Sequence, residues 1–110
     1  MGPQFEITEK RYDAMWNINV KSTFFLIKEC LPLLRKGKAS NICMISSVTG
    51  RNPNYMIGIY GSTKAAMDNM VKWMADELMA DGIRVTAIAP GLIETEFSGP
   101  LWKGNKELNP

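Results

Sequence analysis

Apolar residues recur with the 3.6-residue period of an α-helix from Thr8 to about Lys36. The threonine is a residue type that caps helix starts, and Gly37 is typical of a helix end. We therefore expect one long helical segment over residues 8–36. Its apolar stripe is formed by Tyr12, Met15, Trp16, Val20, Phe24, Ile27, Leu31 and Leu34.

This helical pattern is interrupted near its middle by the polar residues Asn17 and Asn19. A straight helix of this length would span roughly 43 Å, which is long for a small domain. We therefore expect a bend or break at the two asparagines. Pro32 marks a second place for a kink, because proline lacks the backbone N–H of an intrahelical hydrogen bond.

Two short apolar runs, residues 41–47 and 84–89, are typical of strands. The first lacks polar alternation, which predicts burial on both faces of a parallel sheet. A second helical pattern, from about Tyr60 to Ala80, lies between them and ends at Gly82. Strand, helix and strand in this order predict a right-handed βαβ unit with parallel strands.

The fold class expected from this order is α/β, with residues 1–110 forming a single partial domain. Two parallel strands and two long helices do not make a stable sheet alone, because parallel sheets need several strands with both faces covered. We therefore expect the sheet to be completed by further chain or by a partner.

Composition and charge argue against several classes of function. The chain has 110 residues, 45% hydrophobic and 22% charged, with a formal net charge of +2. This mild charge argues against nucleic-acid and anionic-membrane binding. The sequence contains no apolar run of 18 residues, so we expect no membrane span. A soluble intracellular protein, cytoplasmic by default, is the expectation, with peroxisomal and mitochondrial compartments left open.

The absence of histidine removes the commonest zinc ligand and the base of Ser-His-Asp and Cys-His hydrolases. Cys30 and Cys43 are too far apart in sequence for a Cys-x-x-Cys site, so we expect no metal. Cys43 lies in an apolar run, where a cysteine is expected to be a small buried hydrophobic residue.

Polar side chains gather where ligands bind in open α/β sheets, at the carboxyl ends of the strands. Ser46 and Ser47 end the first strand, and residues 90–95 follow the second. Tyr60 and Lys64 begin the helix that starts near the same edge, and their i, i+4 spacing puts them on one helical face.

This grouping is suited to carbonyl reduction or alcohol oxidation. The ammonium of Lys64 is expected to lower the pKa of the Tyr60 phenol, so that the phenol exchanges a proton with substrate. The Ser47 hydroxyl is expected to stabilise charge on the substrate oxygen. Hydride must come from a cofactor, since no side chain supplies it. A Tyr-x-x-x-Lys pair alone is weak evidence, because it arises by chance in roughly one such sequence in four.

Taken together, these motifs resemble the short-chain dehydrogenase/reductase family over roughly residues 8–98, with residues 97–102 similar to its carbonyl-reductase branch. The segments that carry the resemblance are Asn19-Val20, Ser46-Ser47-Val48-Thr49-Gly50, the thirteen-residue step from Ser47 to Tyr60, Tyr60-Gly61-Ser62-Thr63-Lys64-Ala65-Ala66, Ile83-Arg84-Val85-Thr86 and Pro90-Gly91-Leu92-Ile93-Glu94-Thr95.

The resemblance implies a role for each matching residue. Tyr60 would be the acid/base, and Lys64 would lower its pKa and hold the nicotinamide ribose. Ser47 would orient the carbonyl, with Ser46 as its competitor for that role. Asn19 would sit at the helix bend and hold a water in a proton relay.

For the cofactor, NADP or NAD, the resemblance implies contacts from six residues: Tyr60, Lys64, Pro90, Gly91, Ile93 and Thr95. The implied fold is a Rossmann-like doubly wound parallel sheet, of which this sequence lacks the first, nucleotide-binding βαβ unit: no G-x-x-x-G-x-G turn and no N-N-A-G strand end occurs. Residues 96–110 would begin the variable segment that selects the substrate.

Two hypotheses follow. In the first, the chain is the catalytic part of an NAD(P)-dependent oxidoreductase acting on a small-molecule carbonyl or alcohol, and is inactive as 110 isolated residues. In the second, it is a non-catalytic subunit with an interaction or structural role. The resemblance implies a homo- or hetero-oligomer formed through the two long helices in either case.

Overall fold

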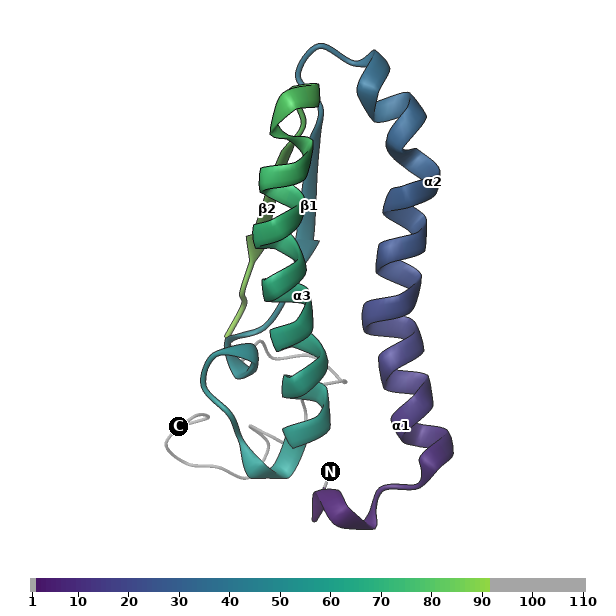
Figure 1. Ribbon diagram of the computed structural model, residues 1–110. Coiled ribbons are helices and arrows are strands. Elements are labelled where there is room, and N and C mark those ends of the chain that lie inside the picture. The colour runs from purple at the N-terminus through teal and green to yellow at the C-terminus, as the bar shows by residue number, and fades with distance from the viewer. Residues whose placement is uncertain (1, 92–110) are drawn as a thin grey trace.

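The computed structural model describes residues 2–91. The predictions for Ile93, Thr95, the branch-specific residues 97–102 and the variable segment 96–110 lie outside the described residues. Within residues 2–91, two long helical segments and a small parallel sheet confirm the expected α/β class (Figure 1).

The first long helical segment is divided into three parts. Helix α1 (Glu9–Trp16) is followed by a π-helical turn, η2 (Asn17–Lys21), and by helix α2 (Ser22–Lys36). The predicted interruption is thus confirmed at the two asparagines. The α2 helix continues through Pro32 and ends at Gly37.

Strands β1 (Asn41–Ile45) and β2 (Arg84–Ile88) pair in parallel, with Asn41 opposite Arg84 and Ile45 opposite Ile88. Helix α3 (Gly58–Leu78) connects them and begins two residues before the predicted start.

Four 3₁₀ turns complete the described chain. Turn η1 (Gln4–Glu6) precedes α1, and η5 (Met79–Asp81) follows α3. Turns η3 (Val48–Gly50) and η4 (Tyr55–Ile57) lie between β1 and α3.

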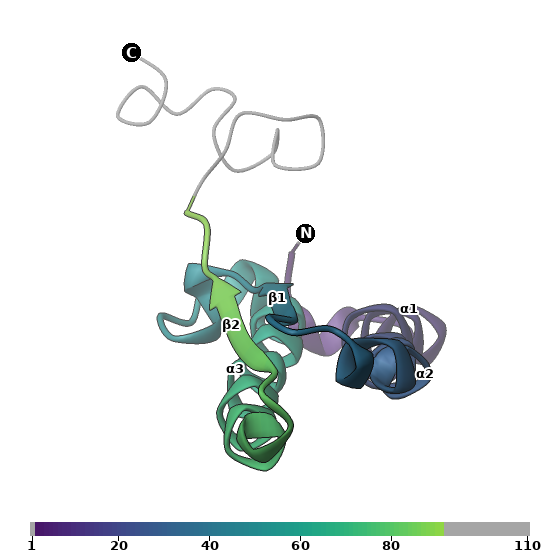
Figure 2. The ribbon, with the colours of Figure 1, turned by 90° about the horizontal axis from the view of Figure 1, so that it is seen from above.

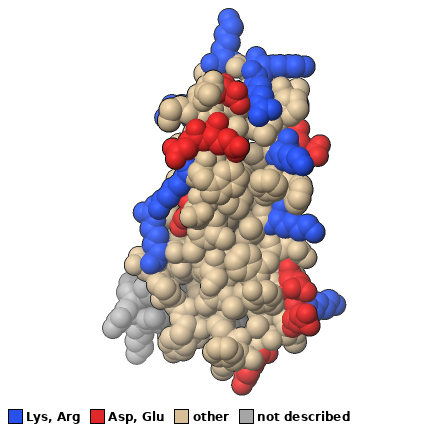
Figure 3. Space-filling model, viewed as in Figure 1, with Lys and Arg blue, Asp and Glu red and all other residues tan. Residues whose placement is uncertain are grey.

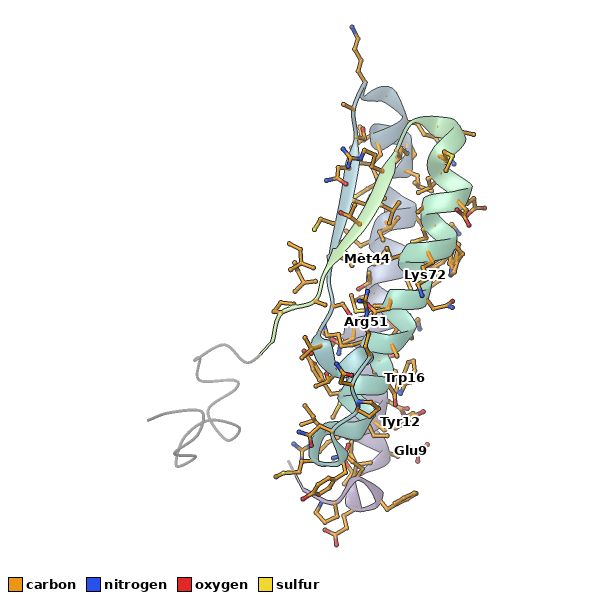
Figure 4. All side chains as sticks on the ribbon, turned by 90° about the vertical axis from the view of Figure 1, so that its left-hand side faces the viewer. Glu9, Tyr12, Trp16, Met44, Arg51 and Lys72 are labelled. Carbon is orange, nitrogen blue, oxygen red and sulfur yellow. The ribbon has the colours of Figure 1, made fainter. Side chains whose placement is uncertain are left out.

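The core fills the space between the sheet and the helices. Viewed from above, α2 and α3 lie on the same side of the sheet (Figure 2). Figure 4 shows the side chains of this layer, with Met44 of β1 labelled. The core is rich in methionine, whose flexible side chain fills irregular spaces. Its buried members are Met44, Met67, Met70, Met74, Leu78, Ile83 and Val85.

The opposite face of the sheet is exposed within residues 2–91, so the expected burial of β1 on both faces is wrong for this part of the chain. Paired residues Ile45 and Ile88 are each 54% exposed. Cys43 is also exposed, which corrects the expectation that it is buried. The reason is strand alternation: these positions point away from the face that carries Met44, and no described element packs on them.

A groove of about 450 Å³ runs beside β1. It lies between α2 and β1, with α3 residues at its base, and its lining is mostly apolar: Leu26, Ile27, Cys30, Ile42 and Met67 are among the lining residues. The described chain leaves the hydrogen-bonding edge of β1 on this side without a neighbouring strand. No helix within residues 2–91 is long and apolar enough to cross a membrane.

Gly82 gives a stability prediction for the turn between α3 and β2. Its φ is +71°, in the left-handed region where a Cβ is strained. Open space surrounds the position, so the strain of a substitution comes from the backbone alone. We expect Gly82→Ala to lower the free energy of unfolding by about 1 kcal/mol in urea titrations. Gly82→Asn should cost less, because asparagine tolerates this conformation; equal stability of the alanine variant and the parent would contradict the prediction.

Candidate active site

The candidate active site lies at the carboxyl ends of both strands. Two backbone hydrogen bonds join the strand exits: Ser46 N–H donates to Ile88 O (2.7 Å), and Val48 N–H donates to Pro90 O (3.1 Å). Helix α3 begins near this same rim, because the chain turns back there after β1 (Figure 1). The predicted convergence of Ser47, Tyr60 and Lys64 on one rim is therefore seen in the described chain.

The two adjacent serines have different partners. Ser46 is only 3% exposed, and its hydroxyl donates to the carbonyl oxygen of Lys64 (3.3 Å). The Ser47 hydroxyl is hydrogen-bonded to the Tyr60 side chain and lies 2.8 Å from the Thr49 hydroxyl oxygen. It also accepts from Thr49 N–H (3.2 Å), which caps η3. Ser47 is thus the serine that faces the phenol.

Lys64 is held between the sheet and the tyrosine. Its Nζ donates to the carbonyl oxygen of Ile45, the last residue of β1, at 2.9 Å, and lies 5.4 Å from the centroid of the Tyr60 ring. Burial lowers the pKa of Lys64, and the nearby Asp68 carboxylate opposes this shift. One of the three ammonium donors is thereby used on backbone, at the rim where a ligand would bind.

The pKa of Tyr60 corrects one expectation. Burial raises it above 10.0, and the hydrogen bond from Ser47 only partly opposes this shift. The expected lowering by Lys64 is therefore wrong for the described chain. Desolvation of the phenolate is the larger effect here, and the ammonium is directed to the Ile45 carbonyl. Tyr60 is accordingly a neutral phenol at physiological pH.

Asn19 contacts this site through a residue that the sequence analysis left without a role. Its Nδ2 donates to Thr63 Oγ1 (3.0 Å), and the Thr63 hydroxyl donates to Tyr60 O (2.6 Å). Thr63 is fully buried, and the Asn19 carbonyl accepts from the Thr23 hydroxyl (2.9 Å). The π-helical turn is therefore joined to the first turns of α3. The one feature of the sequence that could have pointed to Thr63 is that this hydroxyl residue directly precedes Lys64.

Two glycines let the turn that follows Ser47 lie directly against α3. A Cβ at Gly61 would be 2.7 Å from the Thr49 carbonyl oxygen. A Cβ at Gly50 would be 2.9 Å from Asp68 Oδ2 and 3.0 Å from the carbonyl carbon of Lys64. Real Cβ atoms do not come as close as 2.7 Å to a backbone oxygen, so Gly61 is needed for close backbone approach. At Gly50 a Cβ would be tight against the α3 backbone, which would have to shift by a few tenths of an ångström. Both glycines lie in segments that carry the family resemblance, but the sequence alone does not predict this role for either.

The short chain dehydrogenase family model matches residues 1–106. This chain belongs to the short-chain dehydrogenase family. The match covers the Ser47, Tyr60 and Lys64 positions whose geometry is described above.

Relatives of this short-chain dehydrogenase include tropinone reductase-like 3 from Erythroxylum coca, 41% identical over 104 residues. That alignment covers 94% of this chain and 39% of the relative. Dehydrogenase/reductase SDR family member 4 from Oryctolagus cuniculus is 35% identical over 102 residues, covering 93% of this chain and 39% of the relative. The latter bears out the similarity to the carbonyl-reductase branch.

Solved structures show the same fold. A short chain dehydrogenase from Salmonella enterica serovar Typhi superposes with a TM-score of 0.88 at 30% identity, covering 96% of this chain and 43% of that chain. One from Shigella flexneri, solved in complex with NADP, gives 0.86 at 31% identity, covering 94% and 43%. The chain thus spans about two fifths of the length of these relatives.

Pro90 and Gly91 follow β2 at the candidate rim, and the Pro90 carbonyl is already bonded to Val48. Ile93 and Thr95 lie outside the described residues. Within residues 2–91, no three His, Cys, Asp or Glu side chains are grouped as a metal site requires.

The hydrogen bond between Ser47 and Tyr60 gives a prediction for the pKa of the tyrosine. It lowers the pKa of Tyr60 against the effect of burial. Ser47→Ala should therefore move the titration of Tyr60 to higher pH, measured by tyrosinate absorbance and assigned with Tyr60→Phe. Ser46→Ala is the matched control, because Ser46 bonds to the α3 backbone. A larger shift from Ser46→Ala than from Ser47→Ala would overturn the assignment of Ser47 to the phenol.

Proposed function

We propose that this chain is the catalytic part of an NAD(P)-dependent oxidoreductase that interconverts a small-molecule carbonyl and the corresponding alcohol once its sheet is completed. The observation that carries the proposal is the hydrogen bond between Ser47 and Tyr60, with the Lys64 ammonium 5.4 Å from the centre of the same tyrosine ring. Family membership agrees with it.

Tyr60 acts as the proton donor during carbonyl reduction. Because burial keeps its phenol neutral, the proton is present on the side chain when negative charge develops on the substrate oxygen. The hydroxyl of Ser47 faces the same point and donates to that oxygen, as an oxyanion donor does. In the reverse direction, Tyr60 accepts the alcohol proton as phenolate, which needs added positive charge or a less buried phenol.

Lys64 has two functions in this proposal. Its ammonium has three N–H donors and uses one on the Ile45 carbonyl, so the other two are available to the nicotinamide ribose. Its positive charge, close to the Tyr60 ring, stabilises the phenolate whenever the proton has left. Asn19, through Thr63, holds the first turns of α3 beside η2 and so keeps both residues in place.

The cofactor is NADP or NAD. When bound, it gives hydride to the carbonyl carbon or takes hydride from the alcohol. The residues present fit the nicotinamide end of such a cofactor: Lys64, with Pro90 and Gly91 at the same rim. The diphosphate end has no glycine-rich turn in this sequence. The complex of the Shigella flexneri relative with NADP supports nicotinamide cofactor use.

Completion of the sheet is the condition for activity. The groove beside β1 is apolar and follows an unpaired strand edge, which suits a further parallel strand. The exposed pair Ile45 and Ile88 needs a covering layer on the other face. Both features agree with a chain that spans about two fifths of its relatives.

The test uses a sheet-completed form, made by fusing the amino-terminal part of tropinone reductase-like 3 to residue 2. Tyr60→Phe should reduce carbonyl turnover by roughly 100-fold or more, because it removes the general acid, and leave cofactor affinity unchanged. Lys64→Met should reduce both turnover and cofactor affinity, measured by steady-state kinetics and cofactor fluorescence.

The control for this pair is Lys72→Met, a cation two turns further along α3. It should leave turnover and affinity at parent values. Full turnover of the Tyr60→Phe fusion would remove Tyr60 from its role, and unchanged cofactor binding in Lys64→Met would contradict the ribose contact.

The second candidate function, an interaction subunit, is favoured by one surface. The face that α2 and α3 present in Figure 1 has a broad central region without charge (Figure 3). Each of the three helices has an exposed aromatic residue: Tyr12 on α1 is 40% exposed, Phe25 on α2 46% and Trp73 on α3 41%. We call Phe25 and Trp73 the aromatic surface, because both rings lie near the ring of Phe24, at centroid distances of 5.1 Å and 6.4 Å. Aromatic side chains are typical of protein interfaces, and we propose self-association through this surface.

Phe25→Glu tests the aromatic surface. The new carboxylate would lie three residues before Lys28, whose Nζ already lies 5.8 Å from the Phe25 ring, so helix α2 should remain stable. We expect the parent chain to be dimeric or larger by light scattering and the variant to be monomeric. Met79→Glu, at a 71% exposed position of η5, is the control.

A parent chain that is monomeric at all concentrations would contradict the aromatic surface as an interface. The two functions are separated by titrating NADPH and NADH into the sheet-completed fusion, because the isolated chain is expected to be inactive under either function. Micromolar binding would favour the oxidoreductase, whereas a dimer without cofactor binding would favour the interaction subunit.

A further inference from the structure

The amide side chain of Gln4 joins the beginning of the described chain to the beginning of α3. Its Nε2 donates to Met56 O (3.0 Å) and to Gly2 O (2.9 Å), and its Oε1 accepts from Ile59 N–H (2.9 Å). Both the donor and the acceptor of one amide are thus used on backbone groups. The Ile59 contact crosses 55 positions of sequence.

Helix α3 needs this contact because its own cap is weak. The first N–H groups of a helix have no intrahelical partner, and a Ser, Thr, Asp or Asn at the cap usually accepts from one of them. The cap residue of α3 is Ile57, which makes no side-chain hydrogen bond. The side-chain oxygen of Gln4, Oε1, takes that place by accepting from Ile59 N–H.

The packing around the amide is close. A Cβ at Gly58, the first residue of α3, would be 3.3 Å from Gln4 Cγ, tighter than most real contacts. The glycine therefore leaves room for the Gln4 side chain to lie along the helix start. Met56, the other partner in this region, belongs to η4 in the segment between Ser47 and Tyr60.

We propose that Gln4 is a positioning residue for the candidate site: its amide joins the backbone of η4 to the first turn of α3, and so fixes the end of the segment that leads from Ser47 to Tyr60. Ile59 directly precedes Tyr60, and the Met56 contact holds the segment that leads to it. A shift of the helix start would move the phenol away from the Ser47 hydroxyl. Its significance for catalysis rests on the proposed function, but the contact itself does not.

Gln4→Ala tests this role in the full 110-residue chain. Amide hydrogen exchange at Ile59 should become roughly 3- to 10-fold faster, the effect of losing one hydrogen bond of ordinary strength. Amides in the middle of α2 should be unchanged. The titration of Tyr60, followed by tyrosinate absorbance, should move toward that of an ordinary tyrosine, because a loosened helix start exposes the phenol.

Two further variants make the result specific. Thr8→Ala removes the cap of α1, where Thr8 accepts from Arg11 N–H at 3.2 Å, and should leave both Ile59 exchange and the Tyr60 titration unchanged. Gln4→Glu keeps an acceptor for Ile59 N–H at the positive end of α3 while losing the donor to Met56 O. It should retain slow exchange at Ile59, and it serves as the test if Gln4→Ala does not fold.

The proposal is overturned if Gln4→Ala leaves Ile59 exchange at the parent rate, or if exchange rises equally throughout α2 and α3, which would indicate general destabilisation. It is also overturned if Gln4→Glu exchanges at Ile59 as fast as a free amide. None of these readouts needs cofactor or turnover. An inactive sheet-completed enzyme would therefore count against the proposed function while leaving this result standing.

Discussion

The close approach of the turn after Ser47 to helix α3 is the constraint on which the candidate site depends. Gly61 and Gly50 allow backbone and side-chain atoms to approach within distances that a Cβ would block. Because of this contact, the serine at the end of one strand faces a tyrosine of the following helix. Lys64 fixes the same helix to β1 through the Ile45 carbonyl, and Thr63 fixes it to the π-helical turn through Asn19. Each of these contacts comes from a different element, so the phenol is held in position from several sides.

Burial is the largest effect on the pKa of both titratable groups of this site, opposed by the Ser47 hydrogen bond at Tyr60 and by the Asp68 charge at Lys64. Burial raises the pKa of the Tyr60 phenol and lowers the pKa of the Lys64 ammonium, so it favours the neutral form of both. A neutral phenol with a hydroxyl partner is prepared to give a proton, which suits carbonyl reduction. Alcohol oxidation requires the phenolate, whose stabilisation depends on how closely the Lys64 charge can approach it. In the proposed reaction, the balance between the phenol and phenolate forms of Tyr60 is therefore linked to the position of one ammonium group.

Much of the fold could be predicted from the sequence because it depends on local pattern. The helical period, the asparagine interruption at Asn17 and Asn19, and the turn at Gly82 each appear where expected. The exposure of Cys43 could not be predicted, because it depends on which sheet face is covered. The sign of the Tyr60 pKa shift was also missed, because it depends on depth of burial. The Gln4 contact joins residues 55 positions apart, so no local pattern contains it.

Nuclear Overhauser effects in the isotopically labelled chain test directly whether Ser47, Tyr60 and Lys64 share one rim of the sheet. We expect cross-peaks from the Tyr60 ring protons to the β-protons of Ser47 and to the ε-protons of Lys64. Cross-peaks to Lys64 alone, with none to Ser47 while α3 remains helical, would show that the phenol faces elsewhere and would contradict the account.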